Sequence, residues 1–440
     1  MKLSEPINRL WHPIWFLALS LLLILIILPL VRQGMFLDGV FYAAIAKNLS
    51  IGYGTIWQPY YSQTEHTVFY DHPPLAIYFQ SLFFKLLGQG FGVERFYSFL
   101  MALGQFSIIS WYWLKQENTT LINLGLLLFI WLLIPLNYIY ASNMLEGTLT
   151  LFTTIATFIL LIQTRSRTTF LLQYVISAVA VLIAFLCNGP TALFTIAVPL
   201  IQGVSEEKPA IIAGLKRTLV FTLTLTAVFT VFYLLVHEAL QNTNHYINQQ
   251  LLASVIGDRN LKYTGLYHLH ILYLYFRAYW LASTFAILCI IISTKIAKKS
   301  PINSIKQQLK RRNIQLFLLL SLISSLPVGI SHRQAFSYII QSAPFFTLAI
   351  MLLCIEPFKI IINHFNTKPT LFNRVYSLSY MTSIICLITI LYLANGYNRN
   401  EAMIKDIIYL SYYCKNETII STSESIYSQC ITSAYFVSVR

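Results

Sequence analysis

Long uninterrupted apolar runs are the feature that most constrains this chain. A stretch of about 18 or more apolar residues is long enough to cross the hydrocarbon core of a bilayer, and several such stretches recur along the 440 residues. The composition agrees, because 57% of the residues are hydrophobic and only 10% are charged. Water-soluble globular domains do not have this balance. The sequence therefore predicts an all-α polytopic membrane protein.

Eleven membrane spans are expected, each bounded to within a few residues. They are 14–31, 93–113, 121–136, 147–163, 170–187, 191–204, 218–236, 271–294, 314–330, 336–355 and 376–394. The first span is too long for a signal peptide and has no small-residue cleavage site, so we expect a retained anchor.

Three regions follow from these spans. Residues 1–394 are expected to form one transmembrane domain, in which 32–92 is a large first external loop. Residues 395–440 are expected to form a short external tail. Within the loop, the sequence predicts short helices lying on the membrane at 41–50 and at 75–87, which are too short to span it.

The basic excess of the chain reflects its topology. With the N-terminus in the cytoplasm, the cytoplasmic segments hold 18 of the 30 Lys and Arg residues and only 5 of the 16 Asp and Glu residues. Basic residues retained on the cytoplasmic side are what the positive-inside rule predicts. The net charge of +14 is thus a topology signal and not a nucleic-acid-binding surface. We expect a multi-pass protein of the plasma membrane (the inner membrane of a bacterium).

Asp38 directly follows the first span. A carboxylate beside the bilayer is costly unless it is used, and a carboxylate is suited to take the proton from an attacking acceptor group. The alternative is an interfacial Asp that caps a helix starting near Val40. Spacing alone does not separate these two interpretations.

The external loop closes with Tyr70-Asp71-His72-Pro73-Pro74. A residue before proline is pushed towards extended geometry, and two prolines make the turn rigid. Such a turn can direct Asp71 and His72 into a cavity, where they would contact a phosphate or bind a metal ion. The alternative is a Pro-Pro turn with polar flanks and no further role.

Three later segments place polar residues at the outer ends of spans. Glu146 precedes the span 147–163, and Asn188 begins an Asn-Gly-Pro turn. Arg333 is the only Lys or Arg of the outer loop 331–335, and Tyr338 follows it. A guanidinium can bind phosphate through two hydrogen bonds. The alternatives are a helix-start Glu favoured by the helix dipole and a snorkelling Arg.

These motifs, taken in order, resemble those of the polyprenyl-phosphate-dependent membrane glycosyltransferases. This superfamily includes the protein O-mannosyltransferases and the lipid A aminoarabinose transferases and has the GT-C fold. Asp38 with Tyr42 resembles its Asp-acid-x-x-Tyr motif. Three residues depart from the family pattern, which often has a second acid, a Lys and a Lys at these places: Gly39, His72 and Asn188.

The resemblance implies an inverting transfer of a sugar from a polyprenyl-phosphate-linked donor. The acceptor would be lipid A, a glycan or a protein hydroxyl on the outer face of the membrane. Asp38, as general base, and Glu146 would be catalytic. The donor phosphate would be bound by His72, Arg333, Tyr338 and Lys85. Supporting roles would be taken by Tyr42, Asp71, Pro73, Pro74 and Asn188.

No cofactor is required by the sequence. A divalent metal held by Asp71 and His72, or by His268 and His270 in the outer loop 237–270, stays open because no ligand spacing is distinctive. That loop is otherwise interpreted as an aromatic and polar segment at the membrane surface. A disulfide between Cys414 and Cys430 is compatible with an oxidising outer compartment.

Two other functions remain open. A transporter or flippase of lipid-linked sugars also needs intramembrane charges, but these should lie near mid-bilayer, whereas the candidate residues here lie at the outer boundary of the spans. A catalytically degenerate relative of the transferases is kept open by the three departures from the family pattern.

Overall fold

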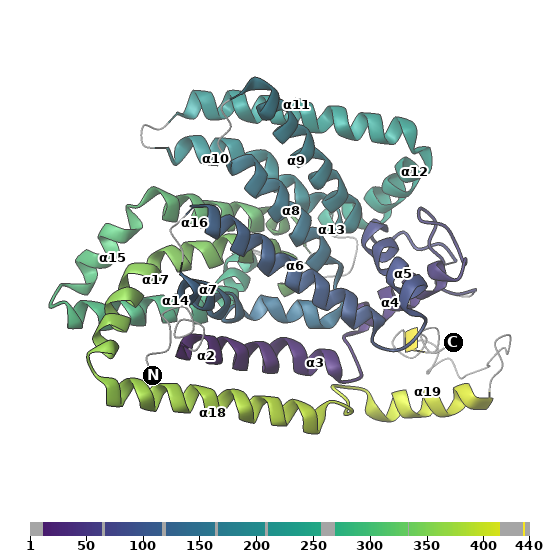
Figure 1. Cartoon of the computed structure of the whole chain (residues 1–440). Helices are drawn as coiled ribbons and strands as arrows, with labels where there is room; N and C mark the ends of the chain where they lie inside the picture. Colours follow the sequence, from purple (N-terminus) through teal and green to yellow (C-terminus); the bar gives the residue numbers. More distant parts are fainter. Residues whose placement is uncertain are drawn as a thin grey trace.

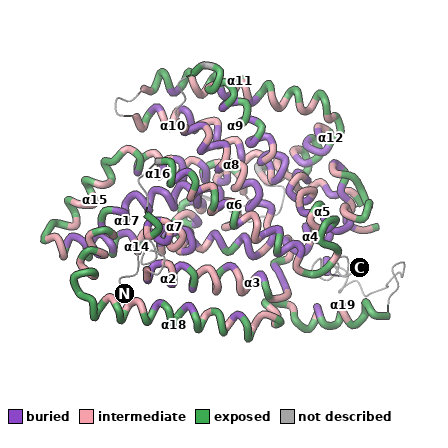
Figure 2. Tube along the Cα trace, viewed as in Figure 1, coloured by how far each residue is buried: buried purple, intermediate pink, exposed green. Residues whose placement is uncertain are grey.

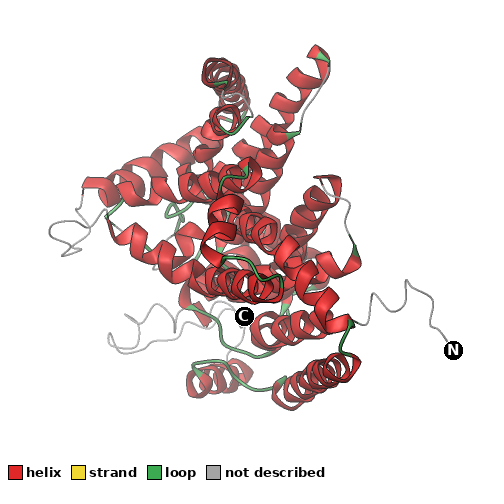
Figure 3. Cartoon of the chain, turned by 90° about the vertical axis from the view of Figure 1, so that its left-hand side faces the viewer, coloured by secondary structure: helices red, strands yellow, loops and turns green. Residues whose placement is uncertain are grey.

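The computed structural model describes residues 12–63, 67–116, 120–162, 166–206, 210–256, 269–332, 334–413 and 434–435. These residues form a bundle of helices (Figure 3). Only two isolated β-bridges and no strand occur among them. The expected all-α architecture is confirmed.

Each of the eleven expected spans coincides with a helix or with consecutive helical segments. These are α2 (Pro13–Leu22), η1 (Leu23–Ile27) and α3 (Leu28–Val31), α6 (Val93–Gln116), α7 (Leu121–Leu132) with η2 (Pro135–Ser142), α8 (Leu145–Leu161), α9 (Arg167–Asn188), η3 (Pro190–Ala197) with α10 (Val198–Val204), α11 (Ile211–Leu235), α14 (His270–Ile296), α16 (Arg312–Ser325) with η6 (Leu326–Ile330), η7 (Phe336–Ser342) with α17 (Ala343–Asn366), and α18 (Pro369–Leu393).

Seven helical segments of the described chain are long and apolar enough to cross a membrane, or eight if the bent pair α7 and η2 is one span. Three expected spans are helical but fall short of this criterion. The helix α8 and the segment Pro190–Val204 are too short. The helix α6 has 24 residues, but polar and aromatic side chains such as Gln105 and Tyr112 interrupt its apolar run.

The long helices lie roughly side by side, and the short helices at 37–50 and 75–87 lie at one end of the bundle, on the right in Figure 1. In the apolar stretch of α17, 72% of the residues are buried, against 17% in α18 and 11% in α11. The outer helices α11 and α18 are exposed along much of their length (Figure 2), and their exposed apolar residues include Leu223 and Leu391. A large exposed apolar surface of this kind is typical of a protein surrounded by lipid.

Two of the short helices belong to the first external loop. The helix α5 (Leu75–Leu87) has the bounds that the sequence predicted. The helix α4 (Leu37–Ser50) begins four residues earlier than the expected range 41–50, with Phe36 at its N-cap. Asp38 therefore lies in the first turn of α4 and does not cap a helix that starts near Val40. A carboxylate in a first turn is favoured by the helix dipole.

The C-terminal segment folds back onto the start of this loop. The Gln33 amide donates a hydrogen bond to the Gly396 carbonyl at 3.0 Å, and the Met35 amide donates to the Tyr435 hydroxyl at 3.1 Å. The helix α19 (Glu401–Tyr413) adds Ile404 to an apolar cluster with Met35. The backbone that leads into α4 is therefore held by the end of the chain.

Polar contacts fasten α8 to α6 within the apolar bundle. The hydroxyls of Tyr97 and Thr148 lie 2.6 Å apart, and the Gln105 amide donates to the Thr154 hydroxyl at 3.2 Å. The Thr150 hydroxyl donates to the Glu146 carbonyl at 2.7 Å. Hydrogen bonds between or within helices satisfy polar groups that lipid cannot. They hold the first turn of α8 in a defined position.

Candidate active site

Tyr42 lies at the centre of the site that the sequence motifs predict. Its side chain is only 5% exposed, and burial raises the pKa of its phenol well above the ordinary value. Nearby acidic and phenolic groups raise this pKa further by their negative charge: Glu146, Asp38, Tyr338 and Asp71. Four segments far apart in the sequence thus bring ionisable groups within electrostatic reach of one phenol.

Glu146 and Asp38 occupy different environments. Glu146 lies in the first turn of α8, one residue ahead of the predicted span 147–163, and is 5% exposed. Burial, opposed by hydrogen bonds from its own backbone amide and from Ser337 and aided by the charge of Asp38, raises the pKa of its carboxyl to about 7. Asp38 is only half-buried. Two carboxyls in unlike surroundings can take separate acid and base roles.

The turn before α5 presents His72 to this cluster. The His72 ring meets the Tyr42 ring edge-on, with 5.7 Å between ring centroids and an interplanar angle of 86°. Pro73 and Pro74 are buried, and Pro74 is the N-cap residue of α5. The Pro-Pro turn therefore leads directly into α5 and places the His72 ring against Tyr42.

The segment between α11 and α14 covers the site, which the sequence interpretation did not expect. Its described part, up to residue 256, comprises α12 (His237–Tyr246), η4 (Ile247–Leu251) and α13 (Leu252–Ile256). The His245 ring stacks on Tyr70 with centroids 4.5 Å apart. Gln250 donates a hydrogen bond to the Asp71 carboxylate, and the His332 amide donates to the Ser254 carbonyl at 3.1 Å. This segment joins the 70–72 turn to the loop that holds the expected phosphate-binding residues.

Asn188 lies at the end of α9, directly before a close approach of two segments. Gly189 has φ +90°, which favours glycine, and a Cβ there would overlap with the Tyr246 hydroxyl. Tyr246 is 7% exposed, and burial, followed by the neighbouring Tyr338, raises the pKa of its phenol. The Asn-Gly-Pro turn therefore packs against Tyr246, the same phenol that has Tyr338 as a neighbour.

Other predicted residues are not brought to this cluster. Lys85 is exposed in the last turn of α5, about 15 Å along the helix from its first residue at 1.5 Å per residue. His270 begins α14, with its ring beside Tyr273. The remaining predicted residues lie outside the described residues: Arg333, His268, Cys414 and Cys430.

A metal-binding arrangement is not formed by the part of the chain that the structure describes. No three His, Cys, Asp or Glu side chains in that part come together in a way that would hold an ion. The Asp71 carboxylate, one of the expected ligands, accepts a hydrogen bond from Gln250.

Three residues of the site were not predicted from the sequence: Ser337, Tyr246 and Gln250. Ser337 is adjacent to the predicted Tyr338, so the motif pointed close to it. Tyr246 and Gln250 belong to the polar segment after α11, whose sequence indicates an aromatic and polar segment at the membrane surface. The local sequence does not predict that this segment contacts the Asp71 turn, because Gln250 and Asp71 are 179 positions apart.

No protein-family model and no curated protein matches the chain. Solved structures do match it. ArnT from Cupriavidus metallidurans aligns with a TM-score of 0.61 and 12% sequence identity, over 96% of this chain and 83% of ArnT in the apo state. The same values hold for ArnT bound to undecaprenyl phosphate, with 84% of that chain covered.

The archaeal oligosaccharyltransferase AglB from Archaeoglobus fulgidus, in complex with an inhibitory peptide and a dolichol-phosphate, aligns with a TM-score of 0.43 and 12% identity over 96% of this chain and 63% of AglB. The likeness to ArnT establishes the fold of the present chain. The GT-C fold expected from the sequence motifs is confirmed.

Proposed function

We propose that this chain, which has the fold of ArnT, is a membrane glycosyltransferase. It takes a sugar from a polyprenyl-phosphate-linked donor and transfers it, with inversion, to an acceptor oxygen at the outer face of the membrane. The acceptor classes are lipid A, a glycan and a protein hydroxyl. Asp38 acts as the general base.

One observation carries this proposal: Asp38, Glu146 and Asp71 all lie within electrostatic reach of Tyr42, on the helix α4 at one end of the bundle (Figure 1). Acidic groups gathered at the end of the spans suit chemistry at the membrane boundary. A transporter or flippase would instead place its charges near mid-bilayer.

The proposed step uses the residues in separate roles. Asp38 takes the proton from the acceptor hydroxyl as its oxygen attacks the anomeric carbon. The bond from the anomeric carbon to the phosphate oxygen breaks, and its electron pair stays on the released polyprenyl phosphate. Glu146, with a pKa of about 7, orients the acceptor. His72, Tyr338 and Arg333 bind the phosphate.

An apolar groove supports a lipid-linked donor. The groove has a volume of about 570 Å³ and lies between α9, η3 and α11, with Phe185, Ile196 and Phe229 in its wall. It reaches Leu240 on α12, the helix whose last residue, Tyr246, lies against Gly189 beside the site. A prenyl chain in this groove would leave its phosphate near the carboxylates. The binding of undecaprenyl phosphate by ArnT supports the same donor class.

The test is transfer by the purified protein in lipid vesicles with radiolabelled undecaprenyl-phosphate sugars. Asp38→Asn removes the base with little change in shape. The rate at which label leaves the lipid should therefore fall at least about 100-fold. Asp406→Asn is the matched control, since Asp406 is an exposed carboxylate on α19. The acceptor is then identified by where the label arrives.

Two outcomes would contradict the proposal. Full transfer by Asp38→Asn would remove the general base from the mechanism. Specific binding of one labelled lipid without turnover, in wild type and Asp406→Asn alike, would favour a transporter or a catalytically degenerate relative.

A further inference from the structure

Asn143 stands at the junction of the two segments that carry the catalytic carboxylates. It lies between η2 and α8, three residues before Glu146, with φ 55° and ψ 44°. Asn is one of the few residues other than glycine that adopts this left-handed conformation readily. Its side chain is 3% exposed, so its polar groups depend on protein partners.

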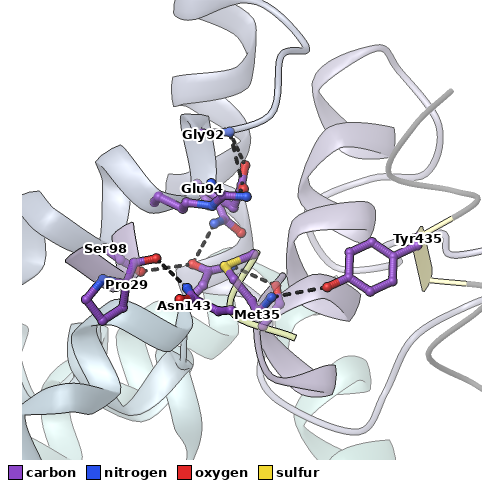
Figure 4. A network of polar contacts seen from close by, with 11 residues as sticks. Pro29, Met35, Gly92, Glu94, Ser98, Asn143 and Tyr435 are labelled. Atoms are coloured by element: carbon purple, nitrogen blue, oxygen red, sulfur yellow. Dashed lines mark hydrogen bonds and ion pairs between the residues drawn. The ribbon is translucent and has the colours of Figure 1, made fainter. Parts of the chain in front are cut away.

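The Asn143 carboxamide has three such partners, each on a different helix. Its Nδ2 donates to the Gly39 carbonyl on α4 at 2.9 Å. Its Oδ1 accepts from Gln80 Nε2 on α5 at 2.7 Å and from the Ser98 hydroxyl on α6 at 3.3 Å. Figure 4 shows Asn143 beside Ser98, with the hydrogen bond between them drawn as a dashed line. Hydrogen bonds at such a buried position are costly to lose.

Gly39 allows the first turn of α4 to approach the backbone before α8 closely. A Cβ at Gly39 would overlap with the Ser142 carbonyl oxygen and lie 3.3 Å from the Asn143 Cβ. The first turn of α4 therefore touches the backbone that leads into α8. This contact explains why the chain has glycine where the resembling family often has a second acid, because no side chain fits there.

We propose that Asn143 is a positioning residue: its carboxamide joins the first turn of α4 to the start of α8 and thereby sets the separation between Asp38 and Glu146. Asp38 directly precedes Gly39, whose carbonyl accepts the hydrogen bond from Asn143. Glu146 lies about one helical turn after Asn143. Gln80 and Ser98 orient the carboxamide. The consequence for catalysis rests on the proposed function, whereas the separation itself does not.

The test detects a change in the separation between Asp38 and Glu146 through the titration of Glu146, and it does not require sugar transfer. Infrared difference spectroscopy follows the protonated carboxyl band of Glu146, assigned with Glu146→Gln, as the pH is changed. The wild-type midpoint is expected at about 7. Asn143→Gly keeps the backbone, since glycine adopts φ 55° without strain, and removes the carboxamide. As α4 relaxes away, the field of Asp38 weakens and the midpoint should fall.

A double-variant cycle separates positioning from simple loosening of the fold. In an Asp38→Asn background, Asn143→Gly should cause little further change, because the charge whose distance it alters is gone. Equal shifts of the Glu146 midpoint with and without Asp38 would show that Asn143 only keeps water out, and would overturn the proposal. The absence of a shift in either background would also overturn it.

Matched variants guard against a folding defect. Asn137 is a buried Asn within η2, and its side chain donates a hydrogen bond to the Trp131 carbonyl. Asn137→Ala should lower thermal stability and leave the midpoint unchanged. Gly39→Ala acts from the other side of the junction, keeps the Asn143 side chain, and should lower the midpoint only when Asp38 is present.

Kinetics then link this separation to the proposed reaction. Asn143→Gly should lower kcat about 10-fold or more while KM for the donor stays within about twofold. Failure of the infrared cycle would refute the positioning role, whereas failure to transfer sugar in wild type would refute the proposed function alone.

Discussion

Gln250 donates a hydrogen bond to the carboxylate of Asp71, 179 positions earlier in the chain. Five residues before Gln250, His245 stacks on Tyr70. The segment between α11 and α14 is therefore fastened at two points to the turn that presents His72. This contact makes the segment part of the site rather than a separate surface loop.

Gln250→Ala should weaken donor use. The variant leaves Asp71 without its amide donor, and a hydrogen bond to a charged group contributes about 1.5–3 kcal/mol. We expect kcat/KM for the lipid donor to fall roughly 10-fold or more. Gln249→Ala, at the exposed neighbouring position, is the control. Equal values for both variants would show that the Asp71 contact has no role in the reaction.

Glu146→Gln should change how stability depends on pH. Burial raises the pKa of Glu146 from 4.5 to about 7, so between these values the folded protein holds a proton that the unfolded chain has released. Stability therefore falls as the pH rises from about 4.5 to 7, by roughly 3 kcal/mol at most. The amide has no proton to lose.

The measurement is the apparent Tm in detergent across this pH range. The apparent Tm of wild type should fall more than that of Glu146→Gln as the pH rises to 7. Above about pH 8, the two curves of Tm against pH should run parallel. Parallel curves throughout would mean that Glu146 titrates in the folded protein as it does in the unfolded chain.

Arg333 is expected to bind the donor phosphate through two hydrogen bonds. A lysine keeps the charge but cannot form the planar two-point contact. Arg333→Ala should therefore raise the Kd for undecaprenyl phosphate about 10-fold or more, and Arg333→Lys should have an intermediate effect. Binding to vesicles with labelled lipid checks this. Equal effects of the two substitutions would argue against two-point contact.

The predicted topology can be checked by labelling single cysteines in intact cells. Gln63 and Lys306 are both exposed and belong to segments expected on opposite sides of the membrane. In a background without the native cysteines, a membrane-impermeant maleimide should label Gln63→Cys and should reach Lys306→Cys only after permeabilisation. The reverse pattern would invert the topology.

Some features of the site follow from the sequence alone. The helix 75–87 is predicted with its observed bounds, because a short apolar run after two prolines defines its own start. Asp38, Glu146 and Tyr338 stand out by their places near the ends of spans, and Asp71 by its place before the Pro-Pro turn; the structure brings all four within electrostatic reach of one phenol. The placement of Lys85 does not follow from the sequence, because the direction of a helix relative to its neighbours is not a local property.

The sequence by itself determined where the apolar helices lie and in which order, since the free energy of placing each residue in lipid is local and adds along the chain. It also marked which residues stand at the span ends. Only the tertiary structure decided that Gln250 meets Asp71 and that Asn143 joins Gly39 to the start of α8. Such contacts depend on how whole helices pack. No periodicity along the chain encodes the distance between two side chains that different helices carry.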